Sequence, residues 1–313
     1  MKTVVLNAAR MNFDGALDLN TLSDSVTVYD ASAQEEIAPR AAGAEVLVTK
    51  ELPVPAPVVE ALPESVRLIC EAGTGYNNID LAACRKKGIA VCNTPAYSTQ
   101  RVAHTAILLL LGLASNMRRQ MAMLARGDRS NFTRYLLVPH TEVNGKTLGV
   151  VGYGNIGRET AKIAKALDMN ILVHTRTPRE EPGVRFTRLD TLLTESDYIT
   201  LHCPLNDATR HLIDAGAIAK MKDGACVINT GRGALIDESA LIAALRSGKL
   251  AGAGLDVQET EPPAADNPLY DMENVILTPH MGWKGLETRQ RLVGILRDNI
   301  AAWEAGSPIN IVS

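Results

Sequence analysis

Short runs of β-branched and other apolar residues alternate with longer mixed stretches through the N-terminal third of the chain. Five of these runs predict strands: Thr3–Leu6, Val26–Tyr29, Glu45–Val48, Arg67–Cys70 and Ile89–Cys92. The stretches between them begin at Ser, Asp or Pro and are rich in Ala, Leu and Glu, as in Pro57–Leu62 and Asp80–Lys87, which predicts helices. Strands that alternate with helices imply βαβ units and a parallel sheet.

A second alternating region follows a long apolar stretch. Residues Val102 to Arg126 contain no proline and are followed by Gly127-Asp128, which predicts one long helix and then a polar connector that ends at Asn144. A final helix is predicted over Leu286–Glu304. Between the connector and this helix, six runs predict strands: Leu148–Val151, Asn170–His174, Tyr198–His202, Cys226–Asn229, Gly252–Asp256 and Val275–Leu277.

Two successive βαβ series in a chain of 313 residues predict two domains. We expect two doubly wound parallel-sheet lobes of the α/β class. Residues 1–98 and 288–313 are expected to form a flavodoxin-like substrate domain, and residues 99–287 a Rossmann cofactor domain. The expected ligand site is a cleft between these lobes.

Composition excludes several classes of function. Charged residues make up 21% of the chain and the formal net charge is -3, so no basic surface for nucleic acid or an anionic membrane is expected. The longest apolar run near the middle, Ala106–Leu111, is too short to span a bilayer. The five cysteines have no C-x-x-C spacing, which favours free thiols and a cytoplasmic location. No cluster has metal-ligand spacing, and we expect no metal.

A glycine motif lies between the first predicted strand and helix of the second domain. Gly152 permits a tight turn, Gly154 allows the backbone to approach a pyrophosphate, and Gly157 allows close helix–strand contact. The helix N-terminus, with Asn155 and Ile156, offers free N–H groups to phosphate oxygens. The motif follows a strand, opens a helix and precedes a second strand, and therefore predicts a dinucleotide site.

The end of the next predicted strand bears on the choice of cofactor. An acidic residue usually stands here and binds the ribose 2′-hydroxyl, but this strand is followed by Thr175 and Arg176. An acidic side chain would repel a 2′-phosphate, whereas a hydroxyl and a guanidinium favour one. We therefore expect NADP(H) to be preferred, with NAD(H) as the alternative and a solvated Arg176 as the simpler interpretation.

Three polar residues lie just past the ends of later predicted strands: Arg232, Glu261 and His280. In an open parallel sheet such positions face the ligand crevice. An arginine can hold a carboxylate with two parallel hydrogen bonds. A histidine can give or take an alcohol proton near neutral pH, and a carboxylate beside it fixes its tautomer. The three residue types together predict acid–base chemistry on a small carboxylic acid.

These segments and the glycine motif closely resemble the D-isomer-specific 2-hydroxyacid dehydrogenase family over nearly the whole chain. The resemblance implies that Arg232 clamps the substrate, that Glu261 pairs with the catalytic histidine, and that His280 is the acid/base. It implies that Asp256 holds the nicotinamide carboxamide. Further cofactor contacts are implied for Cys203, Pro204, Thr209, Thr230 and Gly231. A loop whose backbone amides bind the substrate carboxylate is implied at Gly73, Thr74, Gly75 and Tyr76.

Within the family, the resemblance is nearest to the glycerate dehydrogenase and hydroxypyruvate/glyoxylate reductase branch. Three stretches carry it: Gly73–Leu81, Asn93–Thr99 and Thr278–Trp283. Trp283 is typical of that branch, although core packing is an equal interpretation of a large aromatic. Lys50, Leu52 and Trp283 are candidates for the side-chain pocket, with polar contacts from Lys50 or the Tyr76 region. We expect hydroxypyruvate and glyoxylate to be reduced better than pyruvate or bulky aromatic oxo acids.

Two alternatives to this function remain at the level of sequence. The first is a D-2-hydroxyacid dehydrogenase for another 2-oxo acid, such as pyruvate or phenylpyruvate. The second is an NAD(H)-sensing binding protein, in the manner of corepressors that share this fold. The presence of all three catalytic residue types, without a peptide-recruiting extension, favours the enzyme.

A homodimer is expected from the long apolar helix. The stretch from Val102 to Leu124 is richer in Leu, Ala and Met than one lobe requires. The resemblance puts this stretch, with Phe132 and Tyr135 of the connector, at a two-fold interface, from which Tyr135 would reach the site of the neighbouring subunit.

Overall fold

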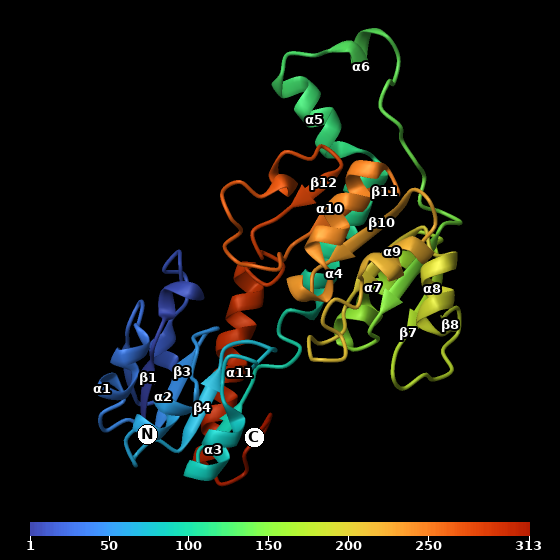
Figure 1. Ribbon diagram of the computed structural model, residues 1–313. Coiled ribbons are helices and arrows are strands. Elements are labelled where there is room, and N and C mark those ends of the chain that lie inside the picture. Colours follow the sequence, from blue (N-terminus) through green and yellow to red (C-terminus); the bar gives the residue numbers. More distant parts are fainter. The chain divides into compact units, whose positions relative to one another are not determined.

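The computed structural model of the chain describes residues 1–313 and contains two compact units. Unit 1 comprises Met1–Ser98 and Trp283–Ser313, and unit 2 comprises Thr99–Gly282 (Figure 1). No helix combines the length and apolar composition needed to cross a membrane.

The second boundary between the units lies at Gly282 and Trp283, whereas the sequence predicted it at residues 287 and 288. The difference has a local cause. Trp283 is 6% exposed and packs in the apolar core of unit 1. Gly282 belongs to unit 2, because its N–H donates to the Asp256 carboxylate at 2.8 Å.

Unit 1 is built on a five-stranded parallel sheet with the order β2-β1-β3-β4-β5. Its strands are β1 (Lys2–Val5), β2 (Ser25–Val28), β3 (Val46–Thr49), β4 (Leu68–Glu71) and β5 (Ala90–Cys92). Its α-helices are α1 (Ile37–Arg40), α2 (Ala56–Ala61), α3 (Leu81–Lys87) and α11 (Leu286–Glu304). Its 3₁₀ turns are η1 (Ala8–Arg10), η2 (Leu19–Leu22) and η3 (Gln34–Glu36). This strand order is that of flavodoxin-like folds.

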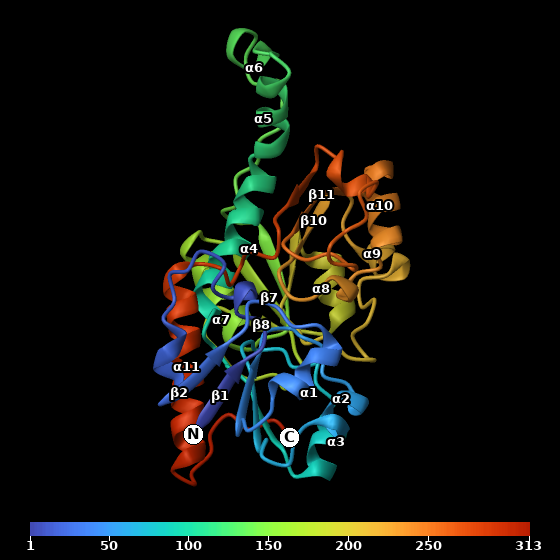
Figure 2. The same cartoon turned by 90° about the vertical axis from the view of Figure 1, so that its left-hand side faces the viewer.

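The inner strands of unit 1 are buried on both faces, whereas β2, at the edge of the sheet, is partly exposed. Val46 and Val48 of β3 face the cluster that contains Leu292 and Leu296 of α11, whereas Leu47 faces the cluster formed with α1, α2 and α3. Figure 2 shows α11 on one side of this sheet and the other three helices on the opposite side. Successive strand side chains point to opposite faces, so a strand covered on both faces is a continuous apolar run.

Unit 2 contains a seven-stranded parallel sheet with the order β12-β11-β10-β9-β6-β7-β8. Its strands are β6 (Thr147–Val151), β7 (Asn170–His174), β8 (Arg185–Phe186), β9 (Tyr198–Leu201), β10 (Ala225–Asn229), β11 (Leu250–Leu255) and β12 (Val275–Leu277). Its helices are α4 (Thr99–Ala114), α5 (Met117–Ala125), α6 (Ser130–Thr133), α7 (Asn155–Ala166), α8 (Leu189–Glu195), α9 (Ala215–Lys220), α10 (Glu238–Ser247), η4 (Gly233–Leu235) and η5 (Pro268–Tyr270). The order reverses where β6 pairs with β9, which is the position of the ligand crevice in Rossmann folds.

The predicted fold class is therefore confirmed in both units. Each predicted strand overlaps an observed one and differs from it by at most two residues at either end. The short β8 at Arg185–Phe186 was not predicted, because two residues carry too little pattern to be recognised.

The prediction of one helix from Val102 to Arg126 was wrong in its middle. α4 ends at Ala114 and α5 begins at Met117, because Asn116 adopts a left-handed conformation with φ of 45°. Asparagine tolerates this conformation better than most residues. The Asn116 amide donates to the Pro139 carbonyl at 2.7 Å, which ties the break to the returning connector. Beyond the break, α5 and α6 project from the rest of unit 2 (Figures 1 and 2).

The turn between β6 and α7 depends on two glycines in contact. Gly152 has φ of 92°, which glycine adopts readily. A Cβ atom on Gly157 would lie 2.2 Å from the Gly152 carbonyl oxygen, a backbone atom that cannot move aside. The first turn of α7 can therefore pack against the strand only with glycine at 157.

The same substitution should change stability in opposite directions at two glycines. Gly157→Ala should lower the free energy of unfolding by about 1–3 kcal/mol, because overpacking forces the backbone apart. Gly294→Ala in α11 should raise it by about 0.5–1 kcal/mol, because nothing lies within 4 Å of the added Cβ and alanine favours a helix. Urea unfolding midpoints measure both changes. A Gly157→Ala chain as stable as the wild type would contradict this account of the turn.

Candidate functional site

The first turn of α7 in unit 2 is open to a ligand. Gly154 is the N-cap and no side chain caps the helix, so the N–H groups that begin α7 have no side-chain acceptor. No heavy atom lies within 4 Å of the position that a Gly154 Cβ would occupy. A Gly152 Cβ would lie 2.5 Å from the Cys203 amide nitrogen, so the turn and the end of β9 are in close contact. Free N–H groups beside open space form the kind of site that binds a pyrophosphate.

The side chains that directly follow β9 and β10 next to this turn, His202, Cys203 and Thr230, are uncharged. Burial raises the pKa of the Cys203 thiol to about 11 and lowers the pKa of His202 to about 3, so both groups are neutral near pH 7. The hydroxyl of Thr230 is buried and has no hydrogen-bond partner. An unpaired buried hydroxyl at this edge is consistent with a ligand contact.

Thr209, which the resemblance placed on the cofactor, uses its hydroxyl within its own loop. The hydroxyl donates to the Pro204 carbonyl at 2.7 Å and accepts from the Asn206 N–H at 2.8 Å. In the structure this side chain closes the loop that follows β9.

The loop after β7 contains one arginine without an acidic partner. Thr175 is half-buried and Arg176 is exposed, with no ion pair to its guanidinium. Farther along, Arg179 pairs with Glu181 at 3.1 Å, and the Tyr153 hydroxyl donates to the same carboxylate at 2.7 Å. The guanidinium of Arg176 is therefore the cation of this loop that remains available to an anion.

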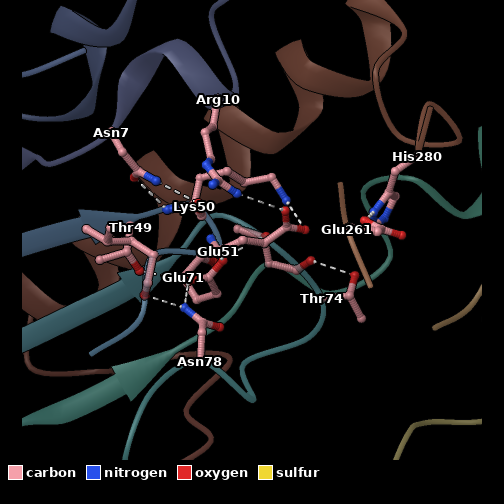
Figure 3. A network of polar contacts seen from close by, with 12 residues as sticks. Asn7, Arg10, Thr49, Lys50, Glu51, Glu71, Thr74, Asn78, Glu261 and His280 are labelled. Carbon is pink, nitrogen blue, oxygen red and sulfur yellow. Dashed lines mark hydrogen bonds and ion pairs between the residues drawn. The ribbon is translucent and has the colours of Figure 1, made fainter. Parts of the chain in front are cut away.

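His280 and Glu261 are brought together in unit 2. Nδ1 of His280 lies 2.9 Å from Oε2 of Glu261 (Figure 3). Oε1 of the same carboxylate accepts the N–H of Gln258 at 3.1 Å, which fixes the carboxylate relative to its own loop. A carboxylate that accepts the Nδ1 proton leaves Nε2 to exchange a proton with a ligand.

A fully buried carboxylate holds the segment that carries His280. Oδ1 of Asp256 accepts from the Thr278 hydroxyl at 2.5 Å and from the Met281 N–H at 2.9 Å, and Oδ2 accepts from the Gly282 N–H at 2.8 Å. The Asp256 carbonyl also accepts the His280 N–H at 2.9 Å. The backbone of His280 has φ of 48°, and these bonds hold it there. Sequence reasoning assigned Asp256 only to the cofactor and missed this role.

Arg232 is half-buried after β10, and one guanidinium nitrogen, Nη1, donates to the Gly231 carbonyl at 2.9 Å. The Asn229 side chain binds both sides of this turn. It accepts from the Gly231 N–H at 3.0 Å and donates to the Arg232 carbonyl at 2.9 Å. The turn is rigid, and the remaining guanidinium N–H groups are available to a carboxylate.

In unit 1, the loop after β4 presents backbone donors. The N–H groups of Thr74, Gly75 and Tyr76 donate to no acceptor in the structure. The loop is held from behind, because Asn93 donates to the Thr74 carbonyl at 2.8 Å and the Thr94 N–H donates to the Gly73 carbonyl at 3.0 Å. Successive free N–H groups on a fixed loop form a concave site for an anion.

A second buried carboxylate, Glu71, organises this edge of unit 1. It is 0% exposed and accepts from the Thr49 hydroxyl at 2.7 Å, the Glu51 N–H at 2.9 Å and the Asn78 amide at 2.9 Å (Figure 3). Burial raises the pKa of Glu71. Sequence reasoning missed this residue, although a glutamate that ends an otherwise apolar strand was a signal for it.

Lys50 and Trp283 contact each other in unit 1. The Lys50 ammonium lies 4.1 Å from the centroid of the Trp283 ring and 3.0 Å from Oε1 of Glu51. The ring of Trp283 packs in the core of unit 1, as one interpretation expected, and it also stacks on this cation. Among His, Cys, Asp and Glu side chains, no group of three or more is placed to bind a metal ion.

Comparison with known proteins shows the family to which these features belong. Residues 107–282 match the family described as D-isomer specific 2-hydroxyacid dehydrogenase, NAD binding domain. The chain is 40% identical to a hydroxypyruvate reductase from Blautia hydrogenotrophica, with all of both chains covered. It is 39% identical to a glycerate dehydrogenase from Methylorubrum extorquens, over 89% of this chain and 88% of the relative.

The solved structures give the same result. A glyoxylate reductase from Paecilomyes thermophila superimposes with a TM-score of 0.87 at 32% identity, covering 100% of this chain and 98% of the other. The family is an oxidoreductase family, so the alternative of a binding protein without turnover is set aside. The chain belongs to the D-isomer-specific 2-hydroxyacid dehydrogenases, in the glycerate dehydrogenase and hydroxypyruvate reductase branch.

Proposed function

We propose that this dehydrogenase reduces hydroxypyruvate and glyoxylate to the corresponding D-2-hydroxy acids, with NADPH as the preferred reductant. The His280–Glu261 contact of 2.9 Å carries the proposal, because it supplies an oriented proton donor. The relatives named hydroxypyruvate reductase, glycerate dehydrogenase and glyoxylate reductase support the substrate class.

Contacts within unit 2 support the roles that we propose for the catalytic residues. A bound reduced nicotinamide supplies the hydride for the carbonyl carbon. His280 gives its Nε2 proton to the carbonyl oxygen, while Glu261 holds Nδ1 and stabilises the imidazolium before transfer. Asp256 fixes the backbone on which His280 stands, and therefore the direction of its ring.

Each unit offers donors that suit a substrate carboxylate. The guanidinium of Arg232 offers a bidentate contact, and the free amides of Thr74, Gly75 and Tyr76 offer a second. Both sets of donors recognise the carboxylate that all 2-oxo acids share. Selectivity between acids therefore has to come from the pocket for the substrate side chain, where we place Leu52, Trp283 and either Lys50 or the Tyr76 region.

The cofactor is proposed from the residues of unit 2. The α7 N-terminus and Gly154 suit the pyrophosphate, and Thr230 supplies an unpaired hydroxyl. Arg176 has no acidic partner, and Thr175 replaces the usual acidic residue. These two features favour a 2′-phosphate, and so NADPH over NADH.

A panel of four acids tests the substrate. Initial rates with hydroxypyruvate, glyoxylate, pyruvate and phenylpyruvate at a fixed NADPH concentration should give higher kcat/KM for the first two. A site that hydrogen-bonds a substrate hydroxyl strongly rejects an analogue without it. A higher kcat/KM for phenylpyruvate than for hydroxypyruvate would contradict the substrate and leave the reaction class intact.

The variant Arg176→Ala tests the cofactor. It should raise the KM for NADPH about ten- to a hundredfold and leave that for NADH nearly unchanged, because only NADPH carries a 2′-phosphate and a charge-assisted contact contributes about 1.5–3 kcal/mol. Arg179→Ala is the matched control, because Arg179 is paired with Glu181. Equal effects of Arg176→Ala on both cofactors would show that this arginine does not contact the phosphate.

We propose a homodimer formed through the projecting α5–α6 region. Its side chains include Met121, Phe132 and Tyr135, which are 62%, 75% and 93% exposed. Exposed apolar side chains gathered on one projection are typical of an interface. Light scattering at micromolar concentration should give twice the chain mass of 33.6 kDa. A monomeric mass would contradict the proposal.

A further inference from the structure

The Lys50 ammonium is buried with fewer acceptors than it has donors. Its side chain is 2% exposed and its one hydrogen-bond acceptor is Oε1 of Glu51 at 3.0 Å. An ammonium group carries three N–H donors. The face of the Trp283 ring, whose centroid lies 4.1 Å from Nζ, takes the place of an acceptor for a second donor. One donor is left without a protein partner. A buried charge normally has all its hydrogen bonds made, so the missing acceptor requires an explanation.

The position of the ammonium points to that acceptor. A Cβ atom on Gly73 would lie 3.5 Å from Lys50 Nζ and 3.2 Å from Glu71 Oε1, so the cation lies directly against the start of the loop. The free amides of Thr74–Tyr76 follow in the same loop. A small acid held by these amides would lie next to the ammonium.

The lysine is held in place from three directions. Its backbone is bonded twice by Asn7, whose amide donates to the Lys50 carbonyl at 2.7 Å and whose oxygen accepts the Lys50 N–H at 2.9 Å. Glu71 fixes the backbone of Glu51, which has φ of 54°. Arg10 approaches the same Glu51 carboxylate at 4.0 Å, so Glu51 lies between two cations (Figure 3). This framework makes the ammonium a rigid donor.

We propose that Lys50 is a specificity-determining residue that donates a hydrogen bond to the hydroxyl oxygen on the carbon next to the substrate ketone. The inference rests on the proposed function, in which the Thr74–Tyr76 amides bind the carboxylate. The carboxylate that all 2-oxo acids share already has those amides. The remaining donor of Lys50 is then the one that distinguishes hydroxypyruvate from acids with an alkyl group in the same place.

Glu51 limits the class of substrate that this donor accepts. The Glu51 carboxylate already neutralises the ammonium, so a neutral hydroxyl can take the remaining donor. A second carboxylate or a phosphate at this place would meet Glu51 as a like charge. We therefore expect monoanionic hydroxy-substituted 2-oxo acids as substrates, and poor activity on dianionic ones.

The test compares two acids of the same shape. Hydroxypyruvate and 2-oxobutyrate differ only in a hydroxyl in place of a methyl group, and the ratio of their kcat/KM values measures recognition of the hydroxyl. Lys50→Met should lower this ratio about ten- to a hundredfold, because the charged donor is lost. The rate with 2-oxobutyrate should change less than about threefold. Lys50→Gln, which keeps a neutral donor, should give an intermediate ratio and provides a second variant if the first does not fold.

Lys162→Met is the matched control, because this lysine is 75% exposed and pairs only with Glu159 on its own helix. It should leave the ratio unchanged. An unchanged ratio in Lys50→Met would overturn the inference, as would an equal loss on both acids, which would assign Lys50 to the common carboxylate. The proposed function is tested separately by the four-acid panel: it fails if the wild-type enzyme has a higher kcat/KM for phenylpyruvate than for hydroxypyruvate.

Discussion

Parallel pairing of all strands in both sheets places the carboxyl ends of the strands of each unit along one edge. In unit 2 this edge carries the glycine turn after β6 and the segments that contain Arg232 and His280. In unit 1 it carries Lys50 after β3 and the loop with free amides after β4. Polar side chains of the candidate site lie at these edges because the inner strands of each sheet are covered on both faces by apolar side chains.

The two units fix their loops by the same physical means. Each has one fully buried carboxylate at the end of a strand, Glu71 in unit 1 and Asp256 in unit 2. Each accepts three hydrogen bonds, including backbone N–H groups of the segments that bear the polar residues. Removal of such a carboxylate leaves several buried donors unpaired, at a cost of about 1–3 kcal/mol for each. These two residues therefore set the geometry of residues that contact the ligand.

Sequence reasoning was effective where the pattern is local. The strands, the glycine motif, and the candidates Arg232, Glu261 and His280 each depend on a few neighbouring residues, and the pairing of the last two is seen in the structure. It failed at Asn116, where one left-handed residue divides a helix whose apolar pattern continues. The φ angle of one residue does not change hydrophobic periodicity, so the pattern could not predict this break.

The contacts that sequence reasoning missed join residues of different strands and loops. Glu71 at the end of β4 accepts from the Thr49 hydroxyl of β3, and Lys50, which the sequence named only as a pocket candidate, stacks on Trp283, more than two hundred positions away. Such pairs are brought together by the order of strands in the sheet. They become visible only after that order is known, because neither residue has a motif of its own.

Proton transfer by His280 is the central claim, and single-turnover reduction of hydroxypyruvate by saturating NADPH measures it most directly. His280→Ala should lower this rate about 10²–10⁴-fold with cofactor binding retained, since the general acid is removed. A near-normal rate in His280→Ala would contradict this role of His280.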